Sequence, residues 1–265
     1  MKNIEIAVID SEKYNFEVMC VAMARMTQRG HKITNLADFY ALLDKPYTDS
    51  ILDSMLLLPH DTIKRFTGIN IVVVGASRRF LAQVTRHQAG VSFMSGSLQY
   101  SDYTGAAQFT VPYDLIRLDA ERHGNAEYVE NYHQTEYLNS CNAALRDYEK
   151  AIEQGVDSDA AAYMMPQGLR NVLVISANPA AWSHMCAQRT CNRNTLETQY
   201  IFLRIWKTLC ESHPIFFKYS GPPCTSGPCP ERNFSCNLPW PHIDRWPGMP
   251  EYILSSAFPY LEEEK

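Results

Sequence analysis

Two runs of β-branched residues, separated by long stretches with helical periodicity, limit most strongly what this chain can fold into. The runs are residues 69–75 and 171–176, both rich in valine and isoleucine. Such runs are typical of buried strands. The chain shows no regular alternation of strands with helices and no glycine-rich turn after a strand. It therefore predicts an α+β fold, with a mixed or antiparallel sheet flanked by long helices, rather than a doubly wound parallel sheet.

Apolar residues recur at helical spacing in residues 13–29, within residues 112–154 and from Thr195 onward, which predicts three amphipathic helices. Shorter helices are expected in four further places: residues 35–46, 50–58, 78–85 and from residue 180 onward. After residue 220, proline and cysteine become frequent and the periodicity disappears. We therefore expect a main domain at residues 1–220 and an irregular tail at residues 221–265.

Charge and cysteine content exclude several classes of function. A net charge of -5 argues against a general nucleic-acid binder. The chain has no apolar run long enough to cross a membrane, and its start lacks the apolar core of a signal peptide. We therefore expect a cytoplasmic protein that binds neither nucleic acid nor membranes. In such a chain, eight cysteines predict reduced thiols or a metal site rather than a disulfide framework.

A first polar cluster follows the predicted helix at residues 78–85. It gathers basic, amide, hydroxyl and aromatic side chains in a short stretch: Arg86, His87, Gln88, Ser92, Ser97, Gln99 and Tyr100. A guanidinium presents a planar fork of donors that suits phosphate, and a neighbouring imidazole can donate a hydrogen bond or stack on a ring. Gln83 precedes Arg86 by one helical turn. This stretch therefore predicts a site for an anionic, planar ligand.

A second cluster, Arg189-Thr190-Cys191-Asn192-Arg193, follows the second predicted strand. Upstream of it, Asn178 and His184 precede Arg189 by 11 and 5 residues along a predicted helix. We expect His184 and Arg189 to approach a common site near the inner end of that helix. Arg193 and Glu197 stand at i, i+4 spacing and are expected to form an ion pair.

Together the two clusters resemble the two signature segments of the flavin-dependent thymidylate synthases. The resemblance implies a homotetramer with shared active sites that methylates the uracil ring of dUMP to give dTMP. It also implies FAD as cofactor, methylenetetrahydrofolate as carbon donor and NADPH as reductant. Upstream, His60-Asp61-Thr62 is similar to the family's His-x-Thr segment, which contacts FAD, and Thr27 stands where the family commonly has a flavin-contacting hydroxyl.

The resemblance also implies roles for individual residues. Those expected to bind the cofactor are His60, Thr62, Arg86, His87, Gln88, Asn178 and His184. Those expected to bind the nucleotide are Gln83, Ser97, Gln99 and Arg189. Arg189 would polarise the pyrimidine and Ser97 would help to orient it, so these two are the expected catalytic residues.

Three neutral residues depart from the family pattern. Gln88 and Gln99 stand where the family has arginines, and Ala162 stands where it has an arginine that grips the nucleotide phosphate. Each lost charge-assisted contact would cost about 1.5 to 3 kcal/mol. Arg170, or Arg78 or Arg79 of the partner subunit, could compensate. Two alternatives therefore stay open: a divergent member that alkylates another pyrimidine nucleotide or nucleoside, and an FAD-binding protein without transferase activity.

The cysteines of the tail also resemble a cysteine-bearing tail in one branch of the family. Four thiols, those of Cys191, Cys224, Cys229 and Cys236, would be enough for a tetrahedral zinc site. Their spacing is not that of a standard zinc ribbon, so free or packing thiols are favoured and no metal is expected. Cys186 and Cys191 have no activating partner in the sequence, which argues against a cysteine nucleophile.

Overall fold

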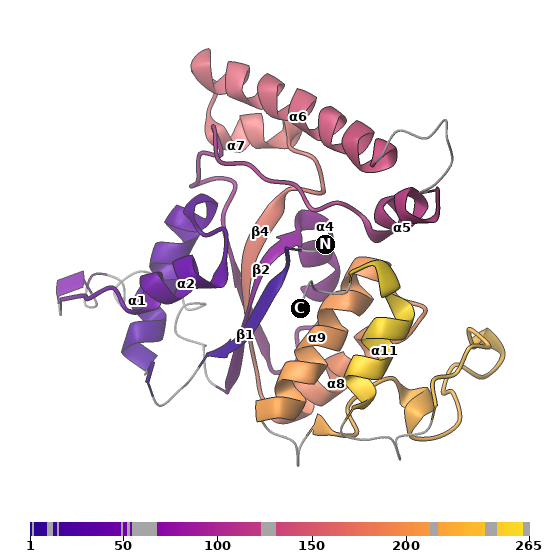
Figure 1. Ribbon diagram of the computed structural model, residues 1–265. Coiled ribbons are helices and arrows are strands. Elements are labelled where there is room, and N and C mark those ends of the chain that lie inside the picture. Colours follow the sequence, from indigo (N-terminus) through magenta and orange to yellow (C-terminus); the bar gives the residue numbers. More distant parts are fainter. Residues whose placement is uncertain are drawn as a thin grey trace.

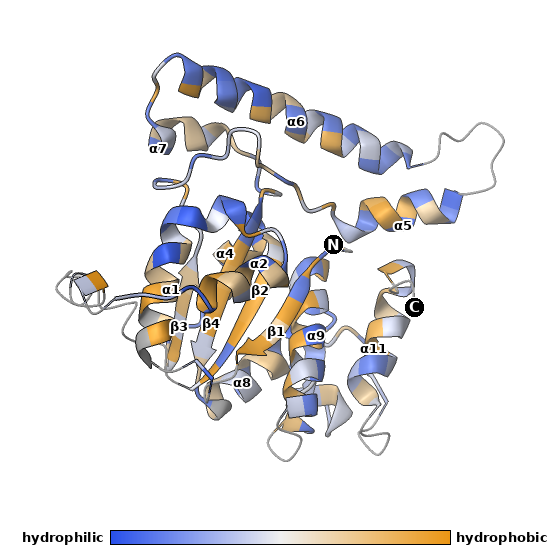
Figure 2. Cartoon of the chain, turned by 60° about the vertical axis from the view of Figure 1, so that its left-hand side comes forward, coloured by the Kyte–Doolittle hydropathy of each residue, from blue (hydrophilic) through white to orange (hydrophobic). Residues whose placement is uncertain are grey.

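The computed structural model describes residues 1, 3–9, 13–14, 16–48, 50–51, 54, 68–122, 131–212, 217–241 and 248–261. A central sheet separates two groups of helices, and a third group crosses one end of the sheet (Figure 1). Apolar residues concentrate on the strands, whereas α6 is largely hydrophilic (Figure 2). Among the described residues, no helix is both long and apolar enough to span a bilayer.

The sheet has four strands in the order β1-β2-β4-β3, and every neighbouring pair is antiparallel. The strands are β1 (Glu5–Ile9), β2 (Ile69–Ser77), β3 (Val91–Ser95) and β4 (Arg170–Ala177). The two β-branched runs form the central pair of strands, β2 and β4. Each of these strands is buried along almost its whole length. The predicted α+β class with an antiparallel sheet is therefore confirmed.

Both faces of the sheet are covered, which explains why its central strands read as continuous apolar runs. On one face, Val72 and Val74 pack with methionines of the first helix, such as Met19 and Met23. The helices of this face are α1 (Phe16–Arg29) and α2 (Leu36–Leu43). Asn35 caps α2 by accepting a hydrogen bond from the Asp38 N–H, which confirms the predicted start of that helix.

The other face carries the larger core. Ile71 and Val73 pack there with Trp182 and Trp206, all fully or almost fully buried. The helices of this face are α4 (Arg78–Val84), α8 (Pro179–Arg189), α9 (Leu196–Ser212) and α11 (Met249–Ala257). The predicted helices at residues 78–85, from residue 180 and from Thr195 are therefore confirmed.

A third group of helices crosses the end of the sheet at which β4 begins (Figure 1). It contains α5 (Tyr113–Arg122), α6 (Tyr132–Glu153), α7 (Ser158–Ala161) and the 3-10 turn η3 (Ala162–Met164). Its small core includes Tyr103, Tyr148 and Leu169, and the Tyr103 N–H donates to the Tyr148 hydroxyl at 3.2 Å. The helix predicted within residues 112–154 is α6, and α5 precedes it.

The tail differs in part from the prediction. Residues 221–241 are irregular apart from two 3-10 turns, η4 (Pro223–Thr225) and η5 (Arg232–Phe234), as expected. The expectation of an irregular end is wrong for α11, whose Met249 and Ile253 are buried in the same core as α9. Apolar residues at helical spacing fix this helix against the core. A domain boundary at residue 220 stays a prediction. Most of the helix expected at residues 50–58 lies outside the described residues.

Candidate functional site

The sheet register brings the two polar clusters to the same place. Val91, which opens β3, pairs with Ala177, which closes β4. The chain before β3 therefore lies beside the chain after β4. Gly90 has φ +71, and a Cβ at this position would lie 2.8 Å from Asn178 Nδ2. The residues that follow Arg86 thus touch those that open α8.

Arg189 lies at the centre of the contacts between the two clusters. Its Nε donates to His87 Nε2 at 2.8 Å, its Nη2 donates to the Gln83 carbonyl at 3.2 Å, and its Nη1 donates to Asn194 Oδ1 at 3.3 Å. The rings of His87 and His184 meet edge to face, with centroids 6.0 Å apart. We call Gln83, His87, His184, Arg189 and Asn194 the arginine–histidine cluster.

Electrostatics keep His87 neutral. Burial, the Arg189 guanidinium and His184 together lower the pKa of His87 to about 4. Near neutral pH the imidazole is therefore uncharged, and Nε2 accepts a hydrogen bond from the Nε–H of Arg189. Among the described residues, the hydrogen-bond partners of Arg189 are neutral groups. Arg189 consequently keeps a positive charge that these partners do not neutralise, which suits an anion or an electron-rich carbonyl.

Residues at the start of α9 hold Gln83 in place. The hydroxyls of Thr195 and Thr198 both donate to Gln83 Oε1, each at 2.9 Å. Neither threonine was recognised from the sequence, and nor was Asn194. The i, i+3 spacing of the threonines at the start of a predicted helix is the one signal that could have pointed to them.

Among the described residues, the other members of the first cluster do not hydrogen-bond Arg189. The side chains of Arg86 and Gln88 are exposed. Ser97 Oγ accepts the N–H of Gln99 at 3.2 Å and the N–H of Tyr100 at 3.4 Å, so its described contacts lie within its own loop. The Gln99 carbonyl accepts the hydroxyl of Ser158 at 2.9 Å.

Three other predicted cofactor contacts have different outcomes. Asn178 caps α8 by accepting the Ala181 N–H at 2.9 Å. Thr27 lies in α1, where its hydroxyl donates to the Ala24 carbonyl at 2.8 Å. His60 and Thr62 lie outside the described residues.

A pocket of about 650 Å³ lies beside the loop that carries Ser97 and Gln99. It is lined by one side of α4, by β3 with the loop after it, and by η3 with the turn after it. Its polar lining residues are Arg78, Thr85, Ser95 and Gln167, and Ala162 lies on its η3 side. We call this cavity the α4–η3 pocket.

One predicted electrostatic contact is wrong. Arg193 and Glu197 do not share a helix, because α9 begins at Leu196; Arg193 instead lies 4.0 Å from Glu231, and Glu197 binds Ser77. Arg170 was one of three arginines that could compensate for a missing phosphate contact, and that role stays a prediction. Its guanidinium donates to the side chain of Gln108 and to the carbonyl of Asn3, each at 2.7 Å, and does not line the α4–η3 pocket.

The irregular tail packs against the loop that follows Arg189. Asn192 joins the two, because its Nδ2 donates to the Leu238 carbonyl at 3.2 Å and its Oδ1 accepts the Trp240 indole N–H at 3.0 Å. Asn192 Oδ1 also accepts Gln199 Nε2 at 2.7 Å, which ties the loop to α9. The second cluster therefore rests on the tail on one side and on α9 on the other.

The cysteines near this loop are free thiols. Burial raises the pKa of the Cys224 thiol, and the nearby Cys191 and Cys236 raise it further. Among the described residues, no three histidine, cysteine, aspartate or glutamate side chains are arranged to hold a metal ion. Burial also raises the pKa of the Cys186 thiol well above its ordinary value, which leaves it unreactive near neutral pH.

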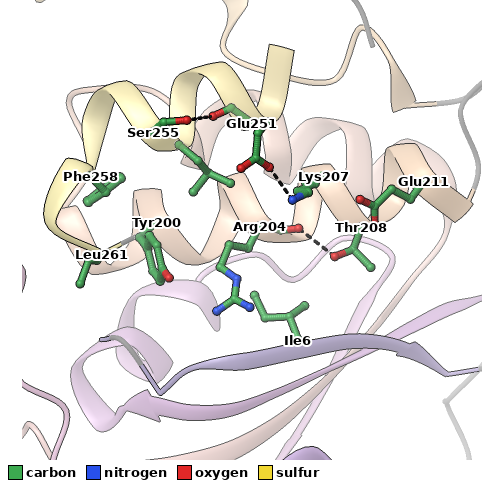
Figure 3. Close-up of a pocket in the computed structure, with 11 residues that line it drawn as sticks. Ile6, Tyr200, Arg204, Lys207, Thr208, Glu211, Glu251, Ser255, Phe258 and Leu261 are labelled. Atoms are coloured by element: carbon green, nitrogen blue, oxygen red, sulfur yellow. Dashed lines mark hydrogen bonds and ion pairs between the residues drawn. The ribbon is translucent and has the colours of Figure 1, made fainter. Parts of the chain in front are cut away.

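A further pocket of about 570 Å³ lies between α9, α11 and β1 (Figure 3). Lys207 of α9 forms an ion pair with Glu251 of α11 across it, while Arg204 reaches down toward Ile6 of β1. None of the residues predicted from the sequence lines this pocket.

Comparison with known proteins gives a family and several relatives. The family described as "Thymidylate synthase complementing protein" matches residues 8–215. A flavin-dependent thymidylate synthase of Geobacter sulfurreducens is 22% identical over 188 residues, which cover 71% of this chain and 75% of that protein. One of Clostridium tetani is 22% identical over 204 residues, 73% and 79% of the two chains. A crystal structure of the UMP/dUMP methylase PolB from Streptomyces cacaoi, bound with 5-Br dUMP, superposes with a TM-score of 0.45 at 16% identity, over 81% of this chain and 93% of that chain.

Proposed function

This chain belongs to the thymidylate synthase complementing protein family, and from that premise we propose that it methylates the uracil ring of dUMP to give dTMP. FAD would be the cofactor, methylenetetrahydrofolate the carbon donor and NADPH the reductant. The names of its relatives support the activity. The observation that carries the proposal is the arginine–histidine cluster, in which both polar segments of the chain meet around Arg189.

In this proposal Arg189 binds and polarises a carbonyl of the pyrimidine. Its guanidinium donors now bind neutral acceptors, which a ligand carbonyl can replace without separating an ion pair. The neutral His87 leaves the positive charge of Arg189 uncompensated, so charge that develops on a ring oxygen would be stabilised. Gln83 stays fixed by Thr195 and Thr198 while the ligand is oriented.

The residues proposed to hold FAD form a donor set that suits a flavin nucleotide. His87 and His184 offer two planar rings, and the exposed Arg86 and Gln88 beside them offer donors for phosphate and ring oxygens. Asn178 lies next to this segment through Gly90. When bound and reduced by NADPH, the flavin would supply the hydride for the reaction, while the chain would orient it and shield it from water.

The contacts of Ser97 and Gln99 favour a shared site. Both residues belong to a loop whose described hydrogen bonds do not reach Arg189. A homotetramer with shared active sites would let this loop act on a nucleotide held by another copy. The tetramer, the cytoplasmic location and the absence of nucleic-acid partners stay predictions.

A second candidate is a relative that alkylates a different pyrimidine nucleotide or nucleoside. The neutral Gln88, Gln99 and Ala162 favour it, because they offer no charge to a phosphate. Titration of the purified protein with FAD and then dUMP, followed by the flavin absorption band, separates the candidates. Tight binding of both supports dTMP synthesis, whereas FAD binding without a response to dUMP supports the second candidate. Stoichiometric flavin with no turnover of any pyrimidine would indicate a binding protein without transferase activity.

Arg189→Ala tests the role of the cluster. We expect the variant to lose dUMP affinity much more than FAD affinity, because the guanidinium is proposed to bind the nucleotide. Arg146→Ala is the matched control, since it removes the same charge from the exposed surface of α6. An equal loss of both affinities, with unchanged circular dichroism, would contradict the assigned role.

A further inference from the structure

We propose that Arg78 makes the α4–η3 pocket an anion-binding site and holds the phosphate of the nucleotide there. The identity of the ligand rests on the proposed function, but the anion site rests on the geometry of this pocket alone.

Backbone and side-chain contacts fix Arg78 in the lining of the pocket. It is the first residue of α4, and its N–H donates to the Leu169 carbonyl at 3.0 Å. Nη1 donates to the Gly96 carbonyl at 3.1 Å, and the side chain lines the pocket. One edge of the guanidinium is thus anchored to protein, and the rest is left for a ligand.

The charge of Arg78 is not compensated by the protein. Its side chain is half-buried, and among the described residues no carboxylate pairs with it. Arg117 on α5 shows the usual arrangement, since it pairs with both Asp114 and Glu121. Burial lowers the pKa of Arg78, which shows that desolvation disfavours its charge. A partly buried, unpaired cation is unfavourable, and an anionic ligand would remove that penalty.

The rest of the lining suits a phosphorylated ring. Arg78 is the sole charged residue among the described residues that line the pocket, so an anion has one place to bind. Hydroxyls of Thr85 and Ser95 provide polar contacts, and Phe93 provides an aromatic surface. A volume of about 650 Å³ is of the size that holds a small ligand.

Arg78 is also coupled to the residues proposed to contact the nucleotide. The carbonyl that it binds belongs to Gly96, directly before Ser97. An anion bound at Arg78 would therefore lie next to the loop of Ser97 and Gln99. Arg78 thus supplies a positive charge, from the same chain, to the pocket that Ala162 lines on its η3 side.

The test compares the binding of dUMP and deoxyuridine to Arg78→Gln. The glutamine amide can still donate to the Gly96 carbonyl, so the variant removes the charge and keeps the anchor. We expect the dissociation constant for dUMP to rise about ten- to a hundredfold, the loss of one charge-assisted contact. Deoxyuridine, which lacks the phosphate, should change less than about twofold. Arg146→Gln is the matched control, because it makes the same change on the exposed surface of α6, away from this pocket. An unchanged dUMP affinity, or an equal loss for both ligands, would overturn the proposal.

A second variant keeps the test decisive. Ala162→Arg places a guanidinium in the same pocket, so in the Arg78→Gln background it should restore a large part of the dUMP affinity without changing that for deoxyuridine. If the native protein binds neither ligand, the proposed function fails and inorganic phosphate becomes the probe. Phosphate should then raise the melting temperature of the native protein and of Arg146→Gln but not that of Arg78→Gln. The same rise, or no rise, in all three proteins would overturn the anion site.

Discussion

Glu197 joins α9 to α4, the helix that carries Gln83 of the arginine–histidine cluster. In the first turn of α9, its Oε1 accepts the Ser77 N–H at 2.8 Å and its Oε2 accepts the Ser77 hydroxyl at 2.5 Å. Ser77 Oγ in turn accepts the Phe80 N–H at 3.1 Å and caps α4. One carboxylate therefore satisfies two donors at the junction of β2 and α4. We predict that Glu197→Gln destabilises the fold.

The expected loss follows from the two hydrogen bonds. A hydrogen bond to a charged group contributes about 1.5 to 3 kcal/mol, and a neutral one about 0.5 to 1.5 kcal/mol. Glutamine keeps one acceptor, for the Ser77 N–H, and its NH2 group faces the Ser77 hydroxyl, which has to turn and accept instead of donating. Both charge-assisted bonds therefore become neutral ones. Because Glu197 is only half-buried, we expect the lower part of the resulting range, about 2 to 3 kcal/mol. For a chain of this size the melting temperature should fall by roughly 4 to 10 °C.

Urea unfolding followed by circular dichroism, at one fixed protein concentration, measures this loss. Glu121→Gln is the matched control, because Glu121 pairs with Arg117 on the exposed surface of α5. That control should cost less than about 1 kcal/mol. Ser77→Ala completes a double-mutant cycle, for which we expect a coupling energy of at least about 1 kcal/mol. Equal losses for the two glutamine variants, with no coupling to Ser77, would refute this reasoning.

Two further predictions concern stability. The folded pKa of His87, about 4, lies below its ordinary value, so unfolding takes up a proton between about pH 6.5 and 4 and the free energy of unfolding decreases as the pH falls through that window. The melting temperature of the native protein should therefore fall more steeply toward acid than that of His87→Gln. Parallel pH profiles of the two melting temperatures would contradict this. Gly221→Ala should cost about 1 to 3 kcal/mol, because a Cβ would lie 2.3 Å from the buried Trp206 ring. Gly227→Ala, with open space around it, should change the free energy of unfolding by less than about 0.5 kcal/mol, and equal effects of the two alanines would contradict the packing argument.

The elements that could be predicted from the sequence are those with a strong local pattern. The strands β2 and β4 are buried on both faces and so read as continuous β-branched runs. The edge strands β1 and β3 have short, half-buried sequences, which carry little periodicity, and they were missed. The helix α11 was missed because prolines precede and begin it and its apolar face is short.

The candidate site follows the same division. His87, His184 and Arg189 could be named from short motifs, and they meet because β3 and β4 pair in a register that no local pattern reveals. The expected pair of Arg193 and Glu197 failed, because helical spacing has no meaning across the start of a helix. Which acceptor a long guanidinium reaches is decided by tertiary structure, as the contacts of Arg189 show.

The hydrogen bond between Trp240 and Asn192 allows intrinsic tryptophan fluorescence to report movement of the loop after Arg189. Trp182 and Trp206 are fully buried and donate to the carbonyls of Ile69 and Phe217, so their fluorescence should be blue-shifted and constant while the core stays folded. Trp240 is partly exposed, and its indole N–H is held by the loop after Arg189. The fourth tryptophan of the chain is Trp246. In a Trp246→Phe variant, a ligand that moves this loop therefore changes the emission of one indole against two fixed ones, and the displacement can be timed without any attached dye.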